Sequence, residues 1–90
     1  MSPTAIGSLE PRRRATVAGE IRAVTSFERP YQRTEVELDD GTGLVVLRFV
    51  GRTHIPGVAP GRRMVAEGTP GAGPDGPVML NPLYCFTSSE

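Results

Sequence analysis

The feature that most constrains the fold is a turn between two short segments near the middle of the 90-residue chain. Residues 34–39 alternate between polar and apolar side chains, and residues 44–50 form a mostly apolar segment. The residues that join them, Asp39-Asp40-Gly41-Thr42-Gly43, include an Asp-Gly pair, which suits the positive φ angles of hairpin turns. The sequence therefore predicts an antiparallel hairpin at this place.

A long strand is predicted before this hairpin and two short strands after it. Residues 14–24 alternate with period two, and Gly19 is the expected place of a bend or bulge. Residues 63–69 form a fourth strand and residues 78–86 a fifth, in which Pro82 requires an edge or a bulge because it lacks an N–H. Alternation points one set of apolar residues inward as the expected core: Val17, Ile21, Val36, Leu38, Val45, Leu47, Phe49, Met64 and Ala66.

The segments between these strands are rich in glycine and proline. Residues 51–61 allow one helical turn at most, over residues 52–55, because each proline removes a donor and clashes with the preceding turn. Residues 70–77 are expected to form a loop. The OB-fold has a long, bent first strand and a compact connection between its third and fourth strands, as predicted here. A small SH3-like barrel has a similar number of strands.

We therefore expect an all-β chain that forms a five-stranded Greek-key OB-fold barrel, with at most one short helical turn between strands 3 and 4. Residues 12–87 would form the domain, residues 1–11 a flexible N-terminal lead-in and residues 88–90 a C-terminal tail. The first residues lack the basic start and apolar stretch of a signal peptide. No apolar run approaches the ~20 residues of a membrane span. These features predict a cytoplasmic protein.

The predicted strands also resemble a known family, the bacterial OB-fold nucleic-acid-binding domains. The segments that carry this resemblance are Val17-Ala18-Gly19-Glu20-Ile21, residues 35–49 with their Asp-Gly-Thr-Gly turn, Pro60-Gly61 with the strand that follows, and Leu80-Asn81-Pro82-Leu83-Tyr84. Within this family the segments resemble the wedge domain of the branched-DNA helicase RecG. The resemblance implies binding of single-stranded or junction nucleic acid by a free-standing module, and it implies no catalysis.

Charge supports this function only through its distribution. The chain has 10 basic and 10 acidic residues, a net charge of 0 and a pI near 6.6, whereas a simple nucleic-acid binder is basic overall. The basic residues are all arginine, and they concentrate in residues 12–33 and 48–67. In residues 34–47, by contrast, every charged side chain is acidic. A neutral protein with segregated charge still presents a basic stripe.

The loop after the first strand is the best candidate site. Here Phe27 and Tyr31 interleave with Arg29 and Arg33. Aromatic rings stack on bases of single strands, and guanidinium groups follow the phosphates. The alternative is that the two rings fold back over the end of the barrel and extend a thin core.

The remaining candidate arginines lie on or beside the strands. Arg22 and Arg48 are expected on the outer sheet face, where they contact phosphate or, alternatively, pair across strands with Glu35 and Glu37. The last candidates are Arg62 and Arg63, which precede the predicted fourth strand. They either border the far side of the ligand-binding groove of the fold or are simply solvated.

Nothing in the sequence indicates catalysis. His54 and Cys85 are single residues of their kinds, so neither a metal site nor a catalytic cluster is expected, and no cofactor is predicted. The expected function is therefore a non-catalytic module that binds single-stranded or branched nucleic acid, DNA rather than RNA. The alternative is a protein-interaction or scaffold OB-fold whose partner covers an apolar sheet face that includes Leu44 and Val46.

Overall fold

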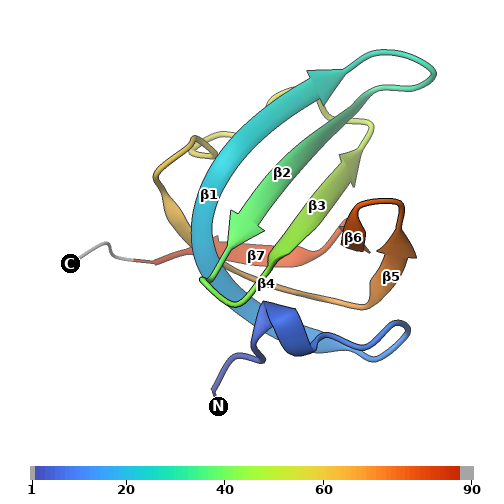
Figure 1. Ribbon diagram of the computed structural model, residues 1–90. Helices are drawn as coiled ribbons and strands as arrows, with labels where there is room; N and C mark the ends of the chain where they lie inside the picture. The colour runs from blue at the N-terminus through green and yellow to red at the C-terminus, as the bar shows by residue number, and fades with distance from the viewer. Residues whose placement is uncertain (1, 88–90) are drawn as a thin grey trace.

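The computed structural model describes residues 2–87, and these form an all-β structure (Figure 1). Its elements are a short 3-10 helix, η1 (Ile6–Ser8), and seven strands: β1 (Ala15–Phe27), β2 (Arg33–Asp39), β3 (Leu44–Val50), β4 (Arg63–Gly68), β5 (Pro70–Gly73), β6 (Gly76–Leu80) and β7 (Leu83–Phe86). The strands make one sheet with the order β5-β6-β3-β2-β1-β4-β7. Only the β3–β6 pair is parallel among these neighbours.

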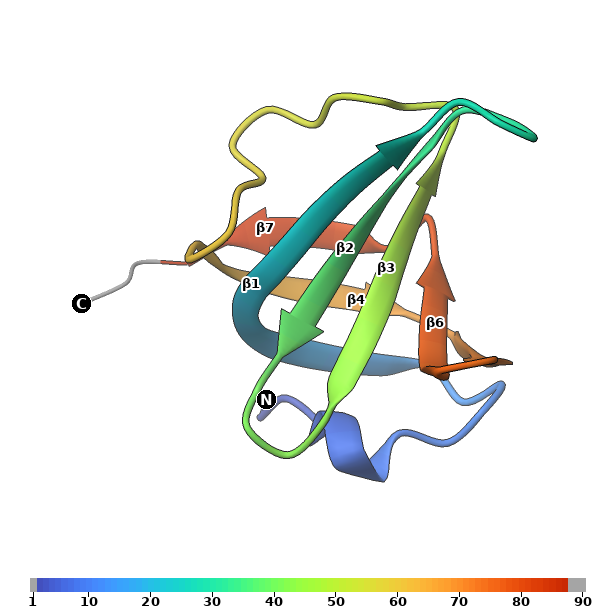
Figure 2. The same ribbon diagram turned by 45° about the horizontal axis from the view of Figure 1, so that its top comes forward.

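Strand β1 bends and pairs with a different strand along each half, as Figures 1 and 2 show. Its first half pairs with β4, and its second half pairs with β2. The register with β2 shifts between Ile21 and Ala23, so the expected bulge lies just after Gly19 rather than at it. Gly19 has a different role, because a Cβ there would meet the backbone oxygen of Asp39 at 2.5 Å. The glycine therefore permits close approach of the two backbones.

The predicted hairpin and the predicted core are both confirmed. Strands β2 and β3 pair in register, and Gly41 in their turn has a φ of 89°. All the residues expected in the core are at most 3% exposed. The predicted core did not include other buried residues, among them Ile6 in η1, Thr34 in β2, Ile55, Pro70 and Met79.

The expected five-stranded barrel is wrong, because the sheet of the described residues has seven strands and is not closed. The predicted fifth strand is interrupted at Asn81 and Pro82, where Asn81 has a φ of 47° and Pro82 has no N–H for a ladder. Residues 70–77, expected to be a loop, instead form β5, a two-residue turn and the start of β6. Glycine and proline favour loops locally, but here pairing between β5 and β6 decides the structure.

The segment expected to be a flexible lead-in packs against the sheet instead. Ile6 in η1 is 2% exposed and belongs to the core. Its N–H donates to Asp40 Oδ2 at 2.9 Å, and the N–H of Gly7 donates to Thr42 Oγ1 at 3.0 Å. The β2–β3 turn therefore holds the N-terminal segment in place. The expected C-terminal tail, residues 88–90, lies outside the described residues.

The connection between β3 and β4 contains turns and no helical segment over residues 51–62. Figure 2 shows it passing over the end of the sheet that also carries the β1–β2 loop, whereas η1 lies at the opposite end. Ile55 from this connection is 3% exposed and completes the core there. Among residues 2–87, no helix is long and apolar enough to span a membrane.

Candidate functional site

The β1–β2 loop brings an arginine between two aromatic rings. The guanidinium carbon of Arg33 lies 4.2 Å from the centroid of the Phe27 ring and 5.0 Å from that of Tyr31. Its Nη1 also donates to the backbone oxygens of Arg29 at 3.1 Å and of Tyr31 at 3.3 Å. Neither ring belongs to the core cluster or to the apolar residues packed on it. The rings are thus arranged around Arg33 and do not extend the core.

A shared carboxylate connects this loop to the sheet face. Glu35 Oε2 accepts from Arg33 Nε at 3.2 Å and from Arg48 Nε at 2.9 Å. The three side chains are 22%, 15% and 32% exposed, in the order Glu35, Arg33 and Arg48. We call Phe27, Tyr31, Arg33, Glu35 and Arg48 the arginine cluster.

The register of the sheet explains why these residues meet. In the paired strands, Phe27 lies opposite Arg33, and Glu35 lies opposite Arg48. Before the bulge the odd-numbered residues of β1 point inward, and after it Val24 takes an inward position opposite Val36. A bulge changes which residues share a face. This change places Phe27 on the outer face, beside the outward residues of β2 and β3.

Arg22, also a candidate from the sequence, lies at the other end of β2. Its Nε donates to Asp39 Oδ2 at 3.1 Å, and its Nη1 lies 3.7 Å from Glu20 Oε2. The pKa of Asp39 is lowered, chiefly by the N–H of Gly41 and then by the Arg22 guanidinium. Arg22 therefore pairs with acidic neighbours outside the arginine cluster.

The two arginines at the start of β4, Arg62 and Arg63, also lie outside the cluster. Arg62 stacks on Phe86, with 4.0 Å between the guanidinium carbon and the ring centroid, and donates to the Gly57 oxygen at 3.1 Å. Arg63 pairs with Glu20 in the β1–β4 ladder and is exposed. Of the sequence-predicted arginines, the structure brings Arg29, Arg33 and Arg48 to one region and leaves Arg22, Arg62 and Arg63 elsewhere.

Sequence reasoning missed a hollow beside the arginine cluster. It has a volume of about 430 Å³, and Arg12 and Arg48 line it together with Val78, Leu80 and the β5 backbone. Leu80 is 59% exposed and lies directly opposite Arg48 in the parallel β3–β6 ladder. Arg12 reaches this place because its N–H donates to the Pro70 oxygen at 2.8 Å. The hollow depends on β5, which the sequence did not predict, so no local signal revealed it.

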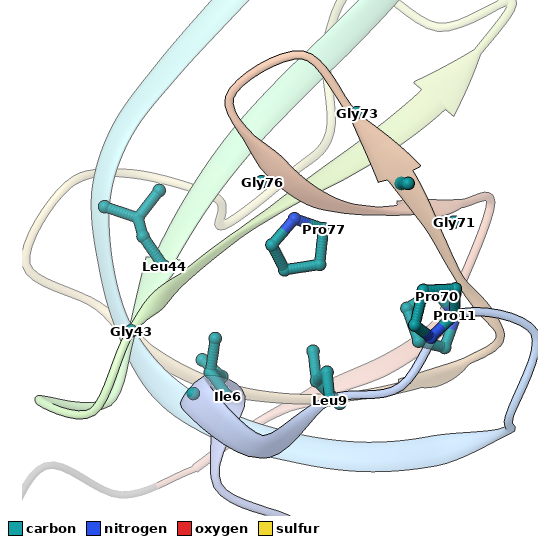
Figure 3. Close-up of a pocket in the computed structure, with 12 residues that line it drawn as sticks. Ile6, Leu9, Pro11, Gly43, Leu44, Pro70, Gly71, Gly73, Gly76 and Pro77 are labelled. Carbon is teal, nitrogen blue, oxygen red and sulfur yellow. The ribbon is translucent and has the colours of Figure 1, made fainter.

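A second pocket adjoins the hollow and shares its β5 lining, residues 70–73, but extends toward η1. It has a volume of about 340 Å³, and Figure 3 shows it between Ile6 and Leu9 on one side and Leu44 and Pro77 on the other. Several of its other lining residues are glycines, so few side chains fill the space. Leu44, at its edge, is 41% exposed.

The outer face of β2 and β3 is mixed rather than uniformly basic or apolar. Strand β2 presents Glu35 and Glu37, whereas β3 presents Leu44, Val46 and Arg48. Within the described part of the chain, no group of three or more His, Cys, Asp or Glu side chains is arranged to hold a metal ion.

The sequence matches no protein-family model, and a search of curated proteins finds no significant relative.

Proposed function

We propose that this protein is a non-catalytic OB-type module that binds single-stranded or branched nucleic acid, DNA rather than RNA, in a cytoplasmic setting. The observation that carries the proposal is the arginine cluster, in which two aromatic rings and two arginines meet on one loop and sheet face. Stacking rings beside guanidinium groups are the common means of binding single strands.

The order of the strands supports the OB-type assignment. Strands β4 and β5 run antiparallel to β7 and β6, so the four make one long hairpin with an interruption in each arm. Strand β6 pairs parallel with β3, and β1 lies between β2 and β4. These are the neighbours expected in an OB-fold whose fourth and fifth strands are each broken in two. OB-folds bind ligands over strands 2 and 3, between the first and last hairpin loops.

The proposed ligand path runs from the β1–β2 loop to the hollow. Phe27 and Leu80 lie three strand spacings apart across β1, β2, β3 and β6, about 14 Å in that direction, and are offset by two residues along the strands. Stacking bases would take the places on Phe27 and Tyr31 that the Arg33 guanidinium occupies in the structure. Arg29 and Arg48 would contact phosphates along this path.

Binding is expected to be weak because acidic residues lie on the same face. The test is a titration of the protein with single-stranded DNA, single-stranded RNA and a three-way DNA junction at several salt concentrations. Each phosphate contact on a single strand adds ~0.7 to the slope of log affinity against log salt, so the contacts of Arg29 and Arg48 predict a slope of roughly 1–2 with micromolar binding. Binding that is absent at low salt would contradict the proposal.

A second candidate function is protein interaction. The observation that favours it is the pocket between η1 and the β5–β6 hairpin, with exposed Leu44 at its rim. Apolar concave surfaces are typical of partner and ligand sites. Affinity for nucleic acid that does not vary with salt would favour this alternative.

A further inference from the structure

Glu35 lies where two guanidinium groups converge. One oxygen, Oε2, accepts from the Nε atoms of Arg33 and Arg48 at 3.2 and 2.9 Å. An anionic oxygen between two arginines is also the arrangement that a phosphate takes in a binding site. The carboxylate therefore already occupies the position that the backbone of a bound nucleic acid would need.

We infer that Glu35 determines specificity by making binding depend on bases rather than on the phosphate backbone; this inference rests on the proposed function. A phosphate that enters must replace the carboxylate and so exchanges one anionic partner of the arginines for another. Little is gained by that exchange. Base stacking on Phe27 and Tyr31 must then supply most of the binding, and a ligand without bases binds poorly.

The two arginines are not held equally. Arg33 is fixed by both rings and by the backbone oxygens of Arg29 and Tyr31 in addition to Glu35. Arg48 has Glu35 as its only side-chain partner among the described residues. Loss of the Glu35 charge therefore chiefly frees Arg48, which also lines the hollow.

The neighbouring carboxylate provides a matched control. Glu37 is the next outward residue of β2, and its ladder partners are Ala23 and Val46. Within residues 2–87 it forms no ion pair. Glu37→Gln therefore removes the same charge from the same face without freeing an arginine.

The experiment compares the wild-type protein, Glu35→Gln and Glu37→Gln. Each is titrated with oligothymidylate and with an abasic oligonucleotide of the same length, which has the phosphates and lacks the bases. We expect wild type to prefer oligothymidylate. In Glu35→Gln, the gain in affinity for the abasic strand should be about three- to tenfold larger than the gain for oligothymidylate. The affinity for the abasic strand should also depend more steeply on salt than in the wild type. Glu37→Gln should shift both affinities by one small, common factor.

A double variant separates the freed arginine from a change in folding. In Glu35→Gln/Arg48→Gln the gain for the abasic strand should disappear, and thermal melting of all variants shows that each is folded. If Glu35→Gln and Glu37→Gln change the two affinities equally while the wild type still binds oligothymidylate, the role of Glu35 is overturned and the proposed function is not. Failure of the wild type to bind oligothymidylate or any other single strand would instead overturn the proposed function.

Discussion

The guanidinium of Arg33 lies over the ring of Phe27, with 4.2 Å between its central carbon and the ring centroid. The same group lies 5.0 Å from the Tyr31 centroid, so one cation occupies two aromatic faces. Such contacts contribute about 0.5–1 kcal/mol at exposed sites. These contacts within the loop hold the two rings against Arg33, so a base that stacks there must compete with its guanidinium.

Removal of one loop ring should weaken binding without unfolding the protein. Phe27→Ala or Tyr31→Ala should cost ~1–3 kcal/mol of binding free energy with little dependence on salt, because base stacking is not an ionic contact. Arg29→Ala should instead lower the salt slope by about one contact. Titrations at two salt concentrations measure both effects.

Phe86 provides the control for these ring variants, since Arg62 stacks on it at 4.0 Å outside the arginine cluster. Phe86→Ala should lower the melting temperature, because the ring packs on the core, and leave the affinity of the folded fraction unchanged. If Tyr31→Ala behaved in the same way, the loop would not be the binding site.

Leu80 should contribute to binding and Leu83 should not. Both side chains are exposed, at 59% and 65%, but only Leu80 lines the hollow beside Arg48. Leu80→Ser should weaken affinity for oligothymidylate several-fold, whereas Leu83→Ser should leave it unchanged. Equal affinities for the two variants would exclude the hollow from the ligand path.

Leu47 should be essential for stability. It is 0% exposed in the centre of β3, so Leu47→Ala should lower the free energy of unfolding by ~2–5 kcal/mol through lost burial and a cavity. Leu44→Ala on the same strand, at an exposed position, should cost less than ~0.5 kcal/mol. Urea unfolding of both variants tests the register of β3, since a shifted register would reverse their order.

Asp40 should make stability depend on acidic pH. Burial raises the pKa of this carboxyl, but hydrogen bonds from Thr42 and from the N–H of Ile6 outweigh it, so the pKa falls below its ordinary value of 3.8. A lowered folded-state pKa stabilises the protein above 3.8, and this contribution is lost as the pH falls toward the folded-state value.

Asp40→Asn should therefore reduce the free energy of unfolding at neutral pH by about 1 kcal/mol, which is less than a buried hydrogen bond to a charged group contributes because solvent screens this carboxylate. The difference from wild type should shrink as the pH is lowered below 3.8. Denaturant unfolding across this range measures it, with Asp75→Asn in the exposed β5–β6 turn as the charge-matched control. A difference that stays constant with pH would show that the charge of Asp40 is not involved.

The sequence by itself determined the elements that depend on neighbouring residues. The β2–β3 hairpin follows from an Asp-Gly turn, and alternation identified buried residues such as Leu38 and Leu47 correctly. It also identified the aromatic and arginine side chains of the β1–β2 loop as a group. These features are local, because strand period and turn chemistry act over a few residues.

Only the tertiary structure decided how distant segments meet. The docking of Ile6 depends on Asp40, which is 34 residues away in the sequence. The ion pair between Glu35 and Arg48 depends on the register of two strands, and the hollow depends on a β5–β6 pairing that local composition disfavours. A period-two pattern states which side of a strand a residue takes, but not which residue of another strand lies opposite it. That partner is set by strand register, bulges and packing across the whole sheet.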